Sequence, residues 1–171
     1  LKRQLIAAGL MTKEDQLNDK GIFRWMPEGM EIQVDARMFE LTAARALGIR
    51  GPGHMQDLFG HSGGPVGEEQ KKLLLEACRL YEGELLTDLT SELWAAENQL
   101  YYQELYFQCV RGCVQVFSEE GQYDKVLTVA RKAARLYPYE EWYIAELDAL
   151  MGMGRWKDAL EASEQSVRFL S

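Results

Sequence analysis

The chain has few cysteines, no long apolar run and no pattern of an export signal. It contains three cysteines, an odd number without regularly spaced pairs, which excludes a disulfide framework and indicates a reducing cytoplasm. No apolar run reaches membrane-spanning length, so we expect no membrane partner. The N-terminus has neither an initiator methionine nor a signal-peptide pattern, and we expect the chain to be a piece of a longer protein.

Positive charge is outnumbered by negative charge, with 19 Lys and Arg against 27 Asp and Glu. The formal net charge of −8 and the pI near 4.9 give an overall field that is unfavourable for binding nucleic acid phosphates. The charge is uneven, because residues 1–50 carry eight Lys or Arg against seven Asp or Glu, a balance of about +1. The rest of the chain therefore carries about −9. Any contact with nucleic acid is expected at the front end.

Catalytic motifs are absent. The glycine-rich stretch "GPGHMQDLFGHSGG" lacks the Lys-Ser/Thr that a phosphate-cradling loop needs, and no Ser-His-Asp order or H-E-x-x-H helix occurs. The two histidines, His54 and His61, have no zinc-type spacing to Cys109 and Cys113, which we interpret as core thiols one helical turn apart. We therefore expect no enzyme activity, no metal and no cofactor.

The first pattern that is present is the alternation in "GIFRWMPEGMEIQVD", residues 21–35. Ile22 and Arg24 fall on one side of a strand, a Pro-Gly turn follows at 26–30, and Ile32 and Val34 share a face of the next strand. This predicts a short N-terminal β-hairpin, which must pack on something because an isolated hairpin is marginal in water. Asp35 is the predicted N-cap of the helix that follows.

Almost everything after Asp35 has helical periodicity. Six helices are expected, with stops at Gly48, Gly83, Gly121, Pro138, Gly154 and the end of the chain. Residues 49–67 form a long loop that contains six glycines and two prolines. The fold class is thus mainly α.

An internal repeat relates the last helices at an offset of 33 residues. Gly121-x-Tyr123 matches Gly154-x-Trp156, and the apolar pair that follows also matches, so a G-x-[YW]-x-x-[AV]-L pattern occurs twice. A period of about 34 with paired helices is typical of tetratricopeptide repeats. The pattern predicts a tetratricopeptide-like α-α superhelix with a groove, in which Gly turns the chain and the aromatic residue packs on the partner helix.

Aromatic residues are the remaining candidates for a partner site. For Trp94, Trp142 and Trp156 the apolar neighbours favour core packing over a place in the groove. Tyr101, Tyr102 and Tyr106 are the partner-binding candidates, because successive tyrosines on one helix are not expected all to face inward. At least one of the first two is expected at a groove or a dimer face.

The stretches "LYEGELLTDLTSELWAAENQLYYQELYFQCV" and "GQYDKVLTVARKAARLYPYEEWYIAELDALMGMGRWKDALEASE" resemble the bacterial transcriptional activator domain. This is the tetratricopeptide-like module of the antibiotic regulatory protein (SARP) class of regulators, and the resemblance covers roughly residues 20–171. In that class the module follows a winged helix-turn-helix domain, whose wing resembles "GIFRWMPEGMEIQVDARMFE" and whose recognition helix resembles "LKRQLIAAGL". The resemblance therefore implies a winged-helix remnant at 1–34 and an activator domain at 35–171.

By the same resemblance, the intact parent protein would bind DNA through the recognition helix and the wing. The candidate DNA contacts are Lys2, Arg3, Lys20 and Arg24, with solvated surface charge as the alternative. The helical array would interact with a protein partner, for which RNA polymerase is one candidate, or self-associate. A generic tetratricopeptide scaffold that binds a protein or peptide outside transcription is the alternative function.

Overall fold

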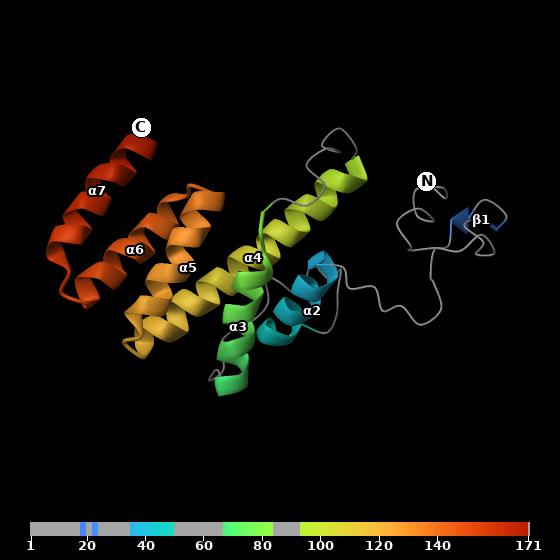
Figure 1. The fold of residues 1–171 in the computed structure, drawn as a ribbon, viewed down its shortest axis with the longest axis horizontal. Coiled ribbons are helices and arrows are strands. Elements are labelled where there is room, and N and C mark those ends of the chain that lie inside the picture. The colour runs from blue at the N-terminus through green and yellow to red at the C-terminus, as the bar shows by residue number, and fades with distance from the viewer. Residues whose placement is uncertain (1–17, 20–21, 24–34, 50–66, 84–92, 171) are drawn as a thin grey trace, which may run out of the picture. The chain divides into compact units, whose positions relative to one another are not determined.

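The structure is a computed structural model that describes residues 18–19, 22–23, 35–49, 67–83 and 93–170. The chain divides into two units, Leu1–Gln33 and Val34–Ser171. The part of the chain that the structure describes is mainly α, as predicted, with two short strands in the first unit and six helices in the second (Figure 1).

In the first unit, strand β1 (Asn18–Asp19) pairs antiparallel with strand β2 (Ile22–Phe23). Asn18 lies opposite Phe23, and Asp19 lies opposite Ile22. This strand pair differs from the predicted hairpin, in which the segment after Gly21 pairs with residues 31–34. Residues 24–34 lie outside the described part, so that pairing stays a prediction.

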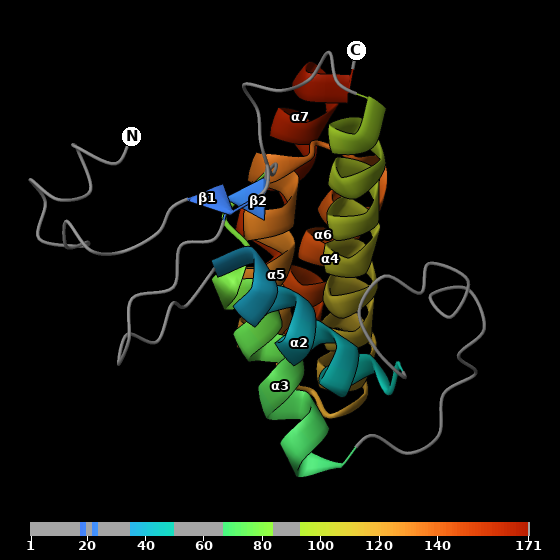
Figure 2. The same ribbon diagram turned by 90° about the vertical axis from the view of Figure 1, so that its right-hand side faces the viewer.

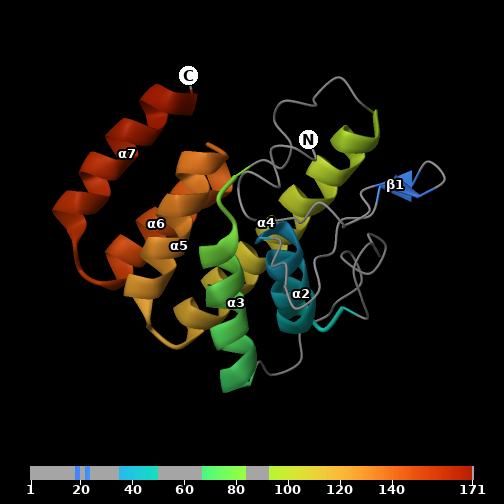
Figure 3. The ribbon, with the colours of Figure 1, turned by 45° about the vertical axis from the view of Figure 1, so that its right-hand side comes forward.

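The second unit contains helices that end close to the predicted stops. Each helix packs against the next one along the chain, and α2 also packs against α4 (Figures 1 and 3). The bounds are Asp35–Leu47 for α2, Glu68–Leu80 for α3, Leu93–Glu119 for α4, Tyr123–Leu136 for α5, Glu140–Gly152 for α6 and Trp156–Leu170 for α7.

Local chemistry explains several of these ends. Helix α2 begins at Asp35, one residue earlier than an N-cap there would place it, and the Asp35 carboxylate accepts the free Ala36 N–H of the first turn at 2.7 Å. Helix α5 is amphipathic and stops shortly before Pro138, which cannot continue it. An ion pair between Lys71 and Glu120 joins the start of α3 to the end of α4.

Equivalent turns follow α4 and α6, and they confirm the predicted role of the repeated glycines. Gly121 and Gly154 have φ angles of 69° and 71°, in the left-handed region that favours glycine. In each turn the residue after the glycine donates its N–H five residues back, from Gln122 to Phe117 at 2.8 Å and from Arg155 to Leu150 at 2.9 Å. This is the Schellman arrangement, which satisfies the last carbonyls of a helix. The two turns therefore match in geometry as well as in sequence.

Helix α4 is the centre of the unit. It is 27 residues long, and α2, α3 and α5 all pack against it (Figure 2). Its buried side chains include Leu105, Tyr106, Cys109, Val110 and Cys113, each with an exposed fraction of zero. Within the described residues, no helix is long and apolar enough to cross a bilayer.

Candidate functional site

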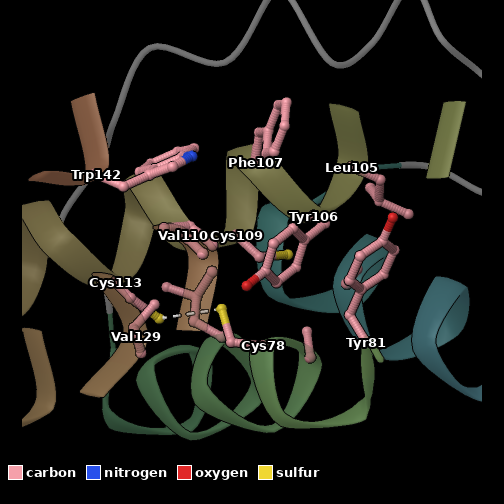
Figure 4. Close-up of a cluster of buried hydrophobic side chains, with 14 of the residues drawn as sticks. Cys78, Tyr81, Leu105, Tyr106, Phe107, Cys109, Val110, Cys113, Val129 and Trp142 are labelled. Atoms are coloured by element: carbon pink, nitrogen blue, oxygen red, sulfur yellow. Dashed lines mark hydrogen bonds between the residues drawn. The ribbon is translucent and has the colours of Figure 1, made fainter. Parts of the chain in front are cut away.

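Tyr106 lies inside the unit, not on a partner surface as predicted. Its ring stacks on Tyr81 with centroids 4.2 Å apart and an interplanar angle of 11° (Figure 4). Its side chain is fully buried, and burial raises the pKa of its hydroxyl. The neighbouring Tyr81 and Tyr137 hydroxyls form a hydrogen bond at 2.7 Å. The cluster joins α3, α4 and the end of α5, and we assign it to the core.

Tyr101 and Tyr102 lie where α2 meets the first half of α4. Tyr101 is 7% exposed and packs edge-on against the Tyr102 ring, so it too lies inside the unit. Tyr102 is partly exposed, and its hydroxyl donates to the buried carboxylate of Glu40 at 3.4 Å. Burial, with a smaller effect of the Glu40 charge, raises the pKa of Tyr102 to about 12. Of the three tyrosines predicted to bind a partner, only Tyr102 reaches the surface.

The negative charge of Glu40 is balanced by a nearby arginine. The residue is 5% exposed, and Arg37 Nη1 donates to its Oε2 at 2.8 Å. A buried carboxylate needs such partners, because leaving it unpaired would cost several kcal/mol. The Tyr102 hydroxyl therefore joins α4 to Glu40 of α2, whereas Arg37, on the same helix as Glu40, balances the charge of the carboxylate.

The cysteines are core thiols, as predicted. Cys109 and Cys113 are fully buried, and the sulfur atoms of Cys78 and Cys113 lie 3.8 Å apart across α3 and α4 (Figure 4). The hydrogen bond with Cys113, and after it burial, raises the pKa of Cys78. Burial raises the pKa of Cys109. Thiols in this state are poor nucleophiles, because the thiolate is the reactive form.

We predict that stability falls at alkaline pH because of these thiols. The thiols of the unfolded chain are half ionised near pH 8.5, whereas the folded chain keeps Cys78 and Cys109 neutral. Their contribution is therefore complete about one pH unit below that value and is lost as the pH rises towards the folded pKa values. The urea midpoint should drop between about pH 7.5 and 9.5. The C109A variant should lose less over this range; an equal loss would contradict the assignment to Cys109.

A polar cluster among the described residues surrounds Arg111 of α4. Its guanidinium binds both carboxylate oxygens of Glu141 at 2.9 and 3.0 Å and reaches Glu104 at 3.3 Å. The same group lies 5.8 Å from the Phe107 ring centroid and 5.7 Å from that of Trp142. We call these five residues the Arg111 surface. It joins α4 to α6. The bidentate ion pair between Arg111 and Glu141, together with the contacts of the guanidinium with the two aromatic rings, fixes the position of the Arg111 charge.

The Arg111 surface continues into an exposed aromatic residue. Tyr139, just before α6, is 47% exposed, and its ring centroid lies 5.5 Å from that of Phe107. Sequence reasoning missed this surface. The available signal was the pair of aromatic residues Tyr139 and Trp142 that follows α5, and nothing in their spacing identifies Arg111 or Phe107 of α4.

The tryptophans divide into a confirmed and a wrong prediction. Trp142 is 1% exposed and lies in the core. Trp156 is 67% exposed, so the prediction that it lies in the core is wrong. The side chain of Trp94 lies outside the described residues.

The predicted DNA contacts Lys2, Arg3, Lys20 and Arg24 also lie outside the described residues. Among the residues that the structure does describe, no group of three or more His, Cys, Asp or Glu side chains could hold a metal ion.

A comparison with protein families gives one match. The family model described as "Bacterial transcriptional activator domain" matches residues 65–171, which is more than half of the chain. No curated protein and no solved structure matches the chain. The match includes α3 to α7, and thus the whole repeat and the Arg111 surface.

Proposed function

Since the chain belongs to the bacterial transcriptional activator domain family, we propose that it is the interaction and self-association module of a DNA-binding regulator of the antibiotic regulatory protein (SARP) class. The family is one of regulatory transcription domains, not of enzymes. The observation that carries the proposal is the match over residues 65–171. A generic scaffold outside transcription is not favoured by that match.

The arrangement of the second unit supports a tetratricopeptide-like superhelix. Its helices pack in sequence order, and the matched turns at Gly121 and Gly154 give α4–α5 and α6–α7 the same local geometry. Repeated helix pairs of this kind stack into arrays that bind partners on extended surfaces. In this proposal Tyr102 contacts a protein partner, for which RNA polymerase is one candidate, or a second protomer.

The division of the chain near residue 34 supports a separate DNA-binding part. The first unit ends at Gln33, close to the boundary between a winged-helix remnant at 1–34 and the activator domain at 35–171. In the parent protein, Lys2 and Arg3 would contact DNA from the recognition helix, and Lys20 and Arg24 from the wing.

We expect DNA binding and transcriptional activation to depend on different parts of the parent protein. The full-length regulator should select specific DNA from a random library, with an affinity that falls steeply as salt increases. A variant without residues 35–171 should keep binding but lose transcriptional activation in a reporter assay. The K20A and R24A variants should each reduce the salt slope by about one.

The control is residues 35–171 alone, a strongly acidic piece that we expect to bind no DNA. Tight, sequence-specific DNA binding by this piece would contradict the proposal. Full activation by the variant that lacks it would do the same.

A further inference from the structure

Helices α5 and α7 occupy equivalent positions in the two repeats, because each follows a turn of the same geometry. The equivalence extends to their buried sides. Val126 and Ala133 of α5 are 1% and 0% exposed, and their counterparts Ala159 and Ser166 are 7% and 8% exposed. One side of α7 is therefore covered just as the matching side of α5 is.

The other side of α7 is not covered by any of the helices that the structure describes. Leu127 of α5 is 7% exposed, whereas its counterpart Leu160 is 63% exposed. Tyr123 is partly buried, whereas its counterpart Trp156 is 67% exposed. Two large apolar side chains one helical turn apart thus face solvent where the first repeat buries the same kind of residue.

The first repeat shows what covers this side of α5. Helix α6 packs against α5, and the Tyr123 ring lies over Gly152 so closely that a Cβ there would be 2.5 to 2.7 Å from three ring carbons. The contact needs a helix that presents a glycine or a similarly small residue to the ring. Continuing the same interface by one repeat requires a second helix of this type over Trp156.

Charge specifies that helix further. Arg131 Nε of α5 donates to Glu146 of α6 at 2.7 Å. The residue equivalent to Arg131 in α7 is Glu164, which is exposed. The sign at this position is therefore reversed, and a helix that covers α7 would carry Lys or Arg where α6 carries Glu146.

We propose that Trp156 and Leu160 form a docking face for an amphipathic helix of a partner protein. This helix has a small residue opposite Trp156 and a basic residue opposite Glu164. The inference uses only packing and charge within residues 117–166, so it does not depend on the role in transcription.

The test grafts such a helix onto the chain. Leu170 is equivalent to Tyr137, so a copy of residues 138–154 placed directly after Leu170 reproduces the connection between α5 and α6. Two versions are made, one with Glu and one with Lys at the position copied from Glu146. Hydroxyl-radical footprinting with mass spectrometry then measures the oxidation rates of Trp156 and Leu160, and Trp142 reports that the unit stays folded.

We expect the Lys version to lower the oxidation rate of Trp156 by about fivefold, because most of its exposed apolar surface would be removed from water. The Glu version should protect less, and E164R in the host chain should reverse that order. Replacing the grafted glycine equivalent to Gly152 by Leu should abolish protection. Equal protection by both versions without reversal, or none by either, would overturn the proposal.

Self-association is the competing outcome. If Trp156 of the ungrafted chain becomes protected as its concentration rises, and light scattering shows a dimer, the face binds a second copy and the proposal is wrong. If the ungrafted chain keeps Trp156 oxidisable at every concentration, the requirement for a partner helix is supported.

Discussion

W142A is expected to lower the free energy of unfolding by about 3–5 kcal/mol, the usual cost of truncating a buried tryptophan. Trp142 is 1% exposed, and its ring packs against Phe107 and under the Arg111 guanidinium. Truncation would leave a cavity between α4 and α6 and remove one face of the Arg111 surface. Urea denaturation followed by circular dichroism measures the change.

W156A is the matched control, because it makes the same chemical change at the equivalent end of the next helix. With 67% of the side chain exposed, we expect a loss below about 0.5 kcal/mol. W142F should cost less than W142A, since it keeps most of the ring volume and the indole N–H has no hydrogen-bond partner among the described residues. Similar losses for W142A and W156A would contradict the assignment of Trp142 to the core.

This pair also shows where sequence reasoning reaches its limit. Both tryptophans stand among apolar helical neighbours, and both were predicted to be buried. Periodicity identifies the apolar side of a helix, but burial of that side depends on which other helix covers it. For Trp142 the covering elements lie within the chain, whereas for Trp156 no described helix covers the ring. The helices and their glycine stops were predictable because they depend on residues close in sequence.

The prediction for the tyrosines of α4 was wrong in part for a related reason. The prediction assumed that the helix has one buried face, so that successive tyrosines could not all point inward. Helix α4 is instead contacted by α2, α3 and α5, and both Tyr101 and Tyr106 are buried. A signal was present for Tyr106, since Tyr106, Cys109 and Cys113 follow the spacing of a buried stripe. The Arg111 surface could not be predicted in the same way, because it joins residues 30 positions apart through tertiary contacts.

G152A is expected to destabilise the chain by about 1–3 kcal/mol, although alanine is normally the better helix former. Any Cβ at this position would lie 2.5 Å from Tyr123 Cζ and 2.7 Å from the two neighbouring ring carbons. The ring cannot bend at its tip as a flexible aliphatic chain can, so either the whole Tyr123 side chain must swing away or α5 and α6 must separate. Urea denaturation gives the loss in free energy.

The neighbouring helix offers a control for this steric argument. A Cβ at Gly112 of α4 would lie 3.2 Å from a terminal methyl carbon of Leu74, which can move by a few tenths of an ångström. The contact is tight but yielding, and Ala gains about 1 kcal/mol over Gly inside a helix, so G112A should change stability by less than about 1 kcal/mol in either direction.

A double-mutant cycle then tests whether Tyr123 is the cause. Y123A removes the ring, so G152A introduced in that background should cost little or even stabilise. A G152A penalty that persists without the ring would show that the glycine serves the backbone at the end of α6 instead. Rescue would establish that the aromatic residue of one helix requires a small residue on the next. The helix proposed to cover Trp156 obeys this same rule, because a bulky residue opposite the indole would keep that helix from approaching α7.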